Sequence, residues 1–188
     1  MPQQAIINAS QAWLNNFVID YNICPFARRE QEKNSIRYLV LEGDDTEQHL
    51  EALIVEAEHL DHHPDSETSL LIFSDGYQDF YDFLDLVAIA EDILIDQDYE
   101  GVYQLASFHP DYCFADAKPD DAANYTNRSP YPMLHIIREA SIEKALTKYP
   151  APEQIPERNI ELTRKLGLEK LQTLLTTCHA QSQTNKKT

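Results

Sequence analysis

The sequence predicts an α/β fold built on a small, largely parallel three-stranded sheet covered by helices. Three short apolar segments rich in strand-forming residues alternate with two long segments whose apolar residues recur every three or four positions. This alternation is typical of a βαβαβ unit with right-handed crossovers, in which the strands run in one direction. Amphipathic stretches before and after the unit predict an N-terminal helix and a C-terminal helical extension.

The N-terminal helix is predicted because Ile6, Ala9, Trp13 and Phe17 recur at helical spacing. It ends before Pro25, which lacks a backbone donor and disfavours helical geometry in the residue before it. We expect strands over the segments 35–41, 68–73 and 102–108. We expect helices over the segments 3–21, 47–60 and 79–96.

A long irregular segment, from His109 to about Pro132, follows the third strand. Structureless loops of more than about 12–15 residues are uncommon in compact domains and are usually functional or disordered. Pro132 is expected to begin a further helix at its first turn, with Leu134 and Ile137 facing inward.

A last helical stretch is predicted from residue 157 to residue 177, interrupted at Gly167. The residues beyond it are polar, so we expect one α/β domain over residues 1–179 and a disordered tail over 180–188.

Charge and composition exclude several classes of protein. The chain has 32 acidic and 15 basic residues, a net charge of −17, which repels nucleic acids and anionic membrane surfaces. It contains no apolar run of about 18 residues and no secretory signal. Three cysteines without close spacing favour a reducing compartment, so we expect a soluble cytoplasmic protein. No glycine-rich nucleotide motif occurs, and the sequence identifies neither a cofactor nor an oligomeric state.

His109 directly follows the third predicted strand. Ligands of open α/β sheets bind beyond the carboxyl ends of the strands, where Gly43 and Ser74 would also lie. A histidine there is a candidate general acid or base, since its ordinary pKa lies near neutrality. The alternative is a histidine that hydrogen-bonds a loop carbonyl.

His135 and Arg138 are three positions apart on the predicted helix and would share one of its faces. Near a helix start, with its free N–H groups, such a pair could hold an anion and move a proton. The alternative is a surface histidine beside an arginine that pairs with Glu139 or Glu143.

The segment TNRSPYP, residues 126–132, is the densest polar cluster. The guanidinium of Arg128 could hold a carboxylate or phosphate in a bidentate manner, and Ser129 adds a hydroxyl. The other side chains expected to contact such a ligand are Asn127 and Tyr131. The alternative is that the asparagines and Ser129 satisfy loop backbone groups while Arg128 fixes the loop to an acidic neighbour.

Cys24 precedes the basic pair Arg28-Arg29, whose charge could favour a reactive thiolate. A catalytic cysteine needs a histidine beside it, and His109 is the candidate. The alternative is a small buried thiol. Metal-binding donor types occur, but without the spacing of a known metal motif, so no metal site is predicted; these donors are His109, Asp111, Cys113 and His135, and separately His59, His62 and His63.

Three motifs together carry a resemblance: CPF after the first helix, then YQLASFHPDYCF, then NYTNRSPYPMLHIIREAS. In these motifs the chain resembles a family of small bacterial proteins known only as a domain of unknown function. The resemblance extends from Trp13 to about Leu174. The resemblance implies that the long loop matters, and it brings no activity with it. The matching positions are Cys24, Pro25, Phe26, His109, Pro110, Tyr112, Asn124, Asn127, Arg128, Ser129, Pro130, Tyr131, Pro132, His135, Arg138 and Glu139.

Two hypotheses follow. In the first, the 109–138 region forms a polar pocket for a small anionic metabolite. Arginines hold the anion, His109 or His135 moves a proton, and Cys24 is a further candidate catalytic residue. In the second, the protein is a non-catalytic interaction module whose loop folds over the sheet and whose acidic surface meets a protein partner. Convergence of the side chains on one concave pocket would favour the first, and their use in backbone contacts would favour the second.

Overall fold

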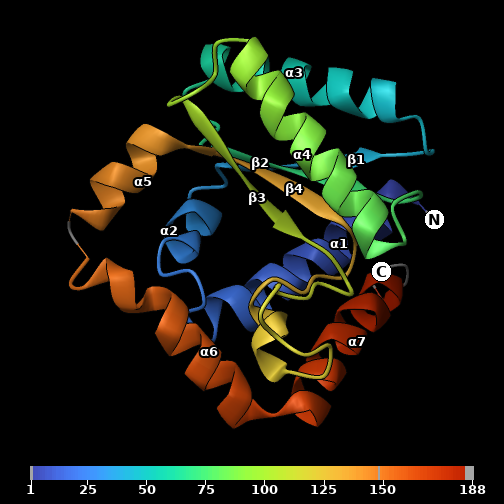
Figure 1. Cartoon of the computed structure of the whole chain (residues 1–188), viewed down its shortest axis with the longest axis vertical. Coiled ribbons are helices and arrows are strands. Elements are labelled where there is room, and N and C mark those ends of the chain that lie inside the picture. The colour runs from blue at the N-terminus through green and yellow to red at the C-terminus, as the bar shows by residue number, and fades with distance from the viewer. Residues whose placement is uncertain (1, 148, 185–188) are drawn as a thin grey trace.

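The protein is described by a computed structural model that covers residues 2–147 and 149–184. A four-stranded mixed sheet lies between two helical layers (Figure 1). The strands are β1 (Ile36–Leu41), β2 (Thr68–Phe73), β3 (Tyr103–Phe108) and β4 (Met133–Arg138). The helices are α1 (Gln3–Trp13), η1 (a π-helix, Leu14–Ile19), α2 (Ala27–Glu32), α3 (Thr46–His62), α4 (Phe80–Asp96), η2 (Ala122–Thr126), α5 (Glu139–Leu146), η3 (Pro152–Gln154), α6 (Ile155–Leu166) and α7 (Leu168–Thr184).

The strand order is β1-β2-β4-β3, with β1 and β2 parallel and β4 antiparallel to both of its neighbours. The three predicted strands and the two helices between them are therefore confirmed as an α/β arrangement. The carboxyl ends of β1, β2 and β3 share one edge of the sheet. The prediction of a three-stranded, largely parallel sheet is corrected, because a fourth strand enters between β2 and β3.

The helix predicted from Pro132 is wrong, because residues 133–138 form the central strand β4. The spacing of Leu134 and Ile137 fits a helix, but the segment MLHIIR also places apolar side chains on both faces of an extended chain, which suits a strand covered from two sides. Helix begins only at Glu139, as α5. The segment forms a strand rather than a helix because it can pair with β2 on one side and with β3 on the other.

The central strands supply two separate cores. Toward α3 and α4, buried side chains include Leu71, Phe73 and Ile136; toward α1 and α7 they include Ile72 and Met133. These alternate along the strands because successive side chains point to opposite faces. Each fully buried side chain of this size contributes about 2 kcal/mol to stability.

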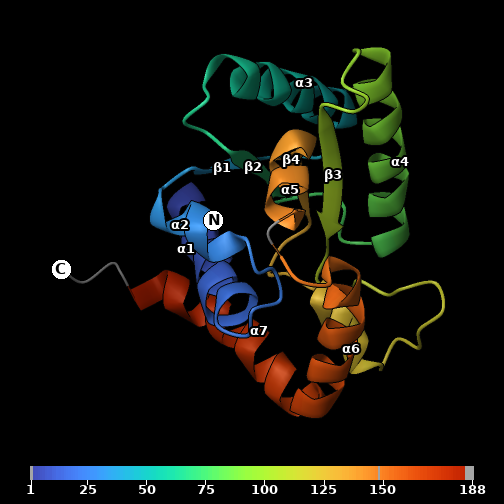
Figure 2. The same cartoon turned by 90° about the vertical axis from the view of Figure 1, so that its left-hand side faces the viewer.

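The predicted N-terminal helix is confirmed, but its last part, Leu14–Ile19, is a π-helix, a rare form often found at functional sites. A short helix after Pro25, α2, was not predicted. In both views α1 lies beside α7, with which it makes extensive contacts (Figure 2).

The break predicted at Gly167 separates α6 from α7, and Gly167 has a φ of +81°, a conformation that favours glycine. Helix α7 continues to Thr184, five residues into the expected tail, and residues 185–188 lie outside the described residues. Within the described residues, no helix is both long and apolar enough to cross a membrane.

Candidate functional site

The segment from His109 to Pro132 leaves the carboxyl end of β3 and returns into β4, and its helix η2 packs against α6 (Figure 2). It therefore lies at the edge of the sheet where the sequence places a ligand. Its polar side chains are held in place by specific contacts.

His109 is 1% exposed, with its ring against Phe80 and Phe83 of α4. Its Nδ1 accepts a hydrogen bond from the backbone N–H of Asp111 at 3.0 Å, and its Nε2 donates to the carbonyl oxygen of Tyr77 at 2.9 Å. This pair of contacts requires a neutral ring protonated on Nε2. Burial lowers the pKa of His109, which agrees with a neutral imidazole.

Arg128 directs its guanidinium back into the loop. Its Nε donates to the carbonyl of Tyr112 at 3.1 Å and its Nη2 to the carbonyl of Pro119 at 3.0 Å, while the guanidinium lies 4.8 Å from the Tyr125 ring centroid. The backbone carbonyl of Arg128 accepts a bond from the Trp13 indole at 3.0 Å. Arg128 thus connects three parts of the loop with α1.

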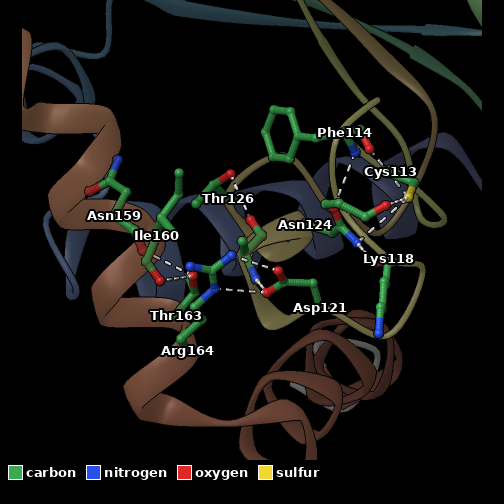
Figure 3. A network of polar contacts seen from close by, with 12 residues as sticks. Cys113, Phe114, Lys118, Asp121, Asn124, Thr126, Asn159, Ile160, Thr163 and Arg164 are labelled. Carbon is green, nitrogen blue, oxygen red and sulfur yellow. Dashed lines mark hydrogen bonds and ion pairs between the residues drawn. The ribbon is translucent and has the colours of Figure 1, made fainter.

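The centre of the loop is a buried polar network around Asn124 (Figure 3). Asn124 is fully buried; its amide donates to the Lys118 carbonyl at 2.8 Å and its Oδ1 accepts from the Phe114 N–H at 3.1 Å. Asp121 caps η2 and forms two hydrogen bonds with Arg164 of α6, at 2.7 and 3.1 Å. The contact with Arg164 lowers the pKa of Asp121 to about 2. The loop is thereby fixed to the C-terminal helices.

The remaining predicted ligand-binding residues also serve the loop. Asn127 donates to the carbonyl of Ser107 at 3.1 Å. Ser129 is fully buried and donates to the carbonyl of Tyr131 at 2.6 Å. Tyr131 is buried and meets the ring of His179 edge-on, at 5.2 Å between centroids.

His135 lies on the α1 side of the sheet, in β4. Its Nε2 is 2.6 Å from the hydroxyl of Thr68, whose single proton is donated to the carbonyl of Ile136 at 2.5 Å. The ring must therefore donate from Nε2 to Thr68. Burial lowers the pKa of His135 to about 4.

Arg138 lies on the opposite face, because positions three apart on a strand point to opposite sides. It donates to the Tyr103 hydroxyl at 3.0 Å, to the Ser66 carbonyl at 3.1 Å and to the Leu60 carbonyl at the end of α3. The expectation that His135 and Arg138 share one helix face is thus wrong.

Cys24 packs in the core on the α1 side, whereas His109 packs against α4 on the other. Burial raises the pKa of Cys24, and N–H groups of Phe26 and Ala27 only partly offset this effect. The structure therefore brings His109, Asn127 and Arg128 together at one edge of the sheet. It places His135, Arg138 and Cys24 elsewhere.

A small hollow lies between the N-terminal helix, η2 and α7. Its volume is about 10 Å³, the space of about one water molecule, whereas metabolite pockets span roughly 300–1,000 Å³. The lining residues are mostly apolar: Trp13, Asn16, Phe17, Tyr125, Arg128, Leu171, Leu174, Leu175 and Cys178.

The sequence reasoning missed His49 and Tyr77, of which Tyr77 is in contact with His109. His49 is 4% exposed and contacts the Tyr77 hydroxyl at 3.1 Å and the Glu42 carbonyl at 3.3 Å. Tyr77 thus contacts His49 through its side chain and His109 through its backbone. The signal was present: His49 has the same helical phase as the buried Leu53 and Leu60.

Potential metal ligands do not assemble in the described part of the chain, where no group of three or more His, Cys, Asp or Glu side chains could hold an ion. The Nδ1 atoms of His62 and His63 contact the carbonyl oxygens of Glu58 and His59 in α3, at 2.7 and 2.8 Å.

Charge is strongly segregated along the chain. No lysine or arginine occurs between Arg37 and Lys118, a stretch that contains both α3 and α4. The two helices that cover one face of the sheet therefore carry carboxylates but no lysine or arginine. Its exposed carboxylates on these two helices include Glu47, Glu51, Glu58, Asp82, Asp85, Glu91, Asp92 and Asp96.

A family model described as "Protein of unknown function (DUF1415)" matches residues 5–173. The match confirms the resemblance carried by the three motifs. No curated protein and no solved structure matches the chain significantly.

Proposed function

The chain belongs to the DUF1415 family of proteins of unknown function, which supplies no activity to inherit, and we propose that it acts by binding a basic protein partner. In this proposal the 109–132 loop is a structural element, and the acidic surface of the α3–α4 layer is the functional one. This is the interaction-module hypothesis formed from the sequence.

The observation that carries the proposal is the use of the loop's polar groups. His109, Arg128 and Ser129 all direct side-chain donors to main-chain carbonyls. A buried loop needs such contacts, since each unsatisfied buried carbonyl or N–H costs about 1–3 kcal/mol. The donors of His109 and Ser129 would have to leave these carbonyls to bind an anion, and Arg128 already directs its Nε and Nη2 into the loop.

The acidic layer supplies the binding side of the proposal. The two helices carry no lysine or arginine, and the contact that Arg37 of β1 makes with α3 is to the buried Glu56. Exposed carboxylates attract cationic partners and speed their association, while they repel phosphate backbones and anionic lipids. The partner that this surface would bind is therefore a protein with a basic surface.

The anion-site hypothesis is the second candidate, because Arg128 lines the small hollow and lies near His109. In this candidate Arg128 binds a small anionic metabolite and a histidine transfers a proton. The hollow would have to enlarge by displacement of the apolar side chains around it.

One pair of measurements separates the two. Selection from a random phage-displayed peptide library at 0.15 M NaCl, roughly physiological ionic strength, should enrich basic sequences on the immobilised protein. Thermal shift with phosphate, citrate and nucleoside triphosphates should show no stabilisation of the wild type. Stabilisation that disappears in Arg128→Gln, without enrichment of basic peptides, would overturn the proposal in favour of the anion site.

A further inference from the structure

Helix α4 has two apolar faces, of which the fold uses one. Its inner face places Phe83, Leu86, Ala90 and Leu94 in the core against the sheet. A helix that only covers a sheet needs no second apolar stripe, because its outer face meets water. The outer face of α4 nevertheless carries exposed apolar residues alongside its carboxylates.

The outer stripe consists of four exposed residues. Tyr81 is 76% exposed, Ile95 51% and Leu84 37%, and Ala88 between them is also exposed. Their steps of three, four and seven positions place them on one line, since a helix turns once every 3.6 residues. Scattered exposed apolar residues are ordinary, but an aligned stripe marks an interaction surface.

Carboxylates border this stripe on both sides. Asp85, Asp92 and Asp96 follow one edge and Glu91 lies at the other, all of them exposed. The helix lies in the acidic layer, on the outside of the molecule away from α1 and α7 (Figures 1 and 2). An apolar stripe between acidic edges is complementary to a basic amphipathic helix.

We propose that the outer face of α4 docks a basic amphipathic helix of a partner protein, with Tyr81, Leu84, Ala88 and Ile95 as the apolar contact line. This inference rests on the proposed function and assigns its binding site. The stripe from Tyr81 to Ile95 is about 21 Å long, which corresponds to a partner segment of about 15 residues. Its three–four spacing is that of helices packed side by side at a shallow angle.

Other occupants fit less well. A second copy of the chain would bring Asp85, Asp92 and Asp96 against the same carboxylates, and like charges in contact cost several kcal/mol. Anionic lipid and nucleic acid meet the same repulsion. A cationic helix satisfies both the apolar stripe and its edges.

The test uses the full chain and two fluorescent 18-residue peptides. The first has leucines at helical spacing with lysines and arginines on the flanks, and the second has the same composition scrambled. Anisotropy at 0.15 M NaCl should show at least tenfold tighter binding of the amphipathic peptide. Equal affinity for both peptides, or no binding up to 1 mM, would overturn the inference.

A matched pair of variants locates the site. The stripe variant Leu84→Lys/Ile95→Lys should weaken binding at least tenfold. The control Val55→Lys/Ile89→Lys carries the same charge change on residues that are 62% and 44% exposed, with Ile89 beyond the acidic edge of α4, and should weaken binding less than threefold. Thermal melts should show both variants folded, since all four sites are exposed; Leu84→Gln/Ile95→Gln repeats the test without added charge.

The outcomes separate this inference from the proposed function. If both double variants weaken binding equally, or if phage selection enriches basic peptides that the stripe variant still binds, the α4 site is wrong and the proposed function stands. If sedimentation shows a wild-type dimer that the stripe variant abolishes, a second copy is the occupant and the inference fails. If no basic peptide is enriched and an anion stabilises the protein, both fail.

Discussion

Arg128 shows how one side chain can hold a loop in place. Two of its donors reach carbonyls seven residues apart in the loop, and its guanidinium lies over the ring of Tyr125. Hydrogen bonds from a charged donor contribute about 1.5–3 kcal/mol when their partners would otherwise stay unsatisfied. Partial exposure of the contact with Pro119 reduces this gain.

Replacement of Arg128 by glutamine should therefore lower the free energy of unfolding by about 2 kcal/mol, because the carbonyls of Tyr112 and Pro119 lose their donors. Urea unfolding monitored by circular dichroism measures the change. The control Arg29→Gln, at a side chain 67% exposed, should change stability by less than about 0.5 kcal/mol. Equal unfolding midpoints for both variants would contradict a structural role for Arg128.

His135 makes the stability of the folded protein sensitive to acid. Its pKa is about 4 in the folded protein against 6.5 for an ordinary histidine, so below pH 6.5 the unfolded chain binds a proton that the folded one does not. The contribution is complete above pH 6.5 and is lost as the pH falls toward 4. His109, whose pKa is also lowered, acts in the same direction.

Between pH 7 and pH 4, His135 should cost the protein up to about 3 kcal/mol of stability. In His135→Gln the stability should fall less steeply over this range, as measured by urea midpoints at each pH. The exposed His62→Gln variant is the control and should follow the wild type. A parallel pH profile for His135→Gln would show that its imidazole does not carry the effect.

At the scale of elements, β4 decides the architecture. It lies between β2 and β3 and supplies side chains to both cores, with Met133 on one face and Leu134 and Ile136 on the other. β2 and β3 run in the same direction, and β4 lies between them and pairs antiparallel with both. The loop before β4 joins strand ends that already lie side by side, at Phe108 and Met133, so the strand order alone does not require its length.

Ile136→Ala should destabilise the protein by about 2–5 kcal/mol, since the isoleucine is fully buried and its removal leaves a cavity. The exposed Ile89→Ala on α4 should cost less than about 1 kcal/mol. Chemical denaturation compares the two. A small effect at Ile136 would mean that β4 is not a central strand.

Local patterns in the sequence predict β1, β2, β3, α3 and α4 correctly, because each is long and periodic or short and apolar. They fail at β4, where helical spacing and strand composition coincide and only its neighbours decide between them. The position of the candidate loop was predictable from strand order. The contact between His109 and the carbonyl of Tyr77 was not, because the two residues are 32 positions apart. The contacts of Arg128 lie within the loop, but they depend on the path that the folded loop takes.

The whole molecule is divided by charge. Every lysine and arginine lies at or before Arg37 or at or after Lys118, so α3 and α4 carry carboxylates with no lysine or arginine among them. Such a layer repels itself in the folded state, and dissolved salt screens this repulsion.

Raising NaCl from about 10 mM to 300 mM shortens the screening length roughly fivefold and should raise the melting temperature. Asp85→Asn/Asp92→Asn should raise it at low salt and reduce its salt dependence, because two exposed carboxylates are removed from one edge of α4. Differential scanning calorimetry measures both effects. A wild-type melting temperature that falls with added NaCl would contradict self-repulsion in this layer.

The sequence alone determined the α/β class, the order of three strands, the acidic character and the place of the long loop, since all of these follow from local periodicity and composition. Only the tertiary structure decided that residues 133–138 form a strand, that His135 and Arg138 face opposite sides, and that α4 leaves an apolar stripe outside. The reason is physical: pairing, burial and hydrogen-bond partners depend on segments far apart in the chain, which local patterns do not contain.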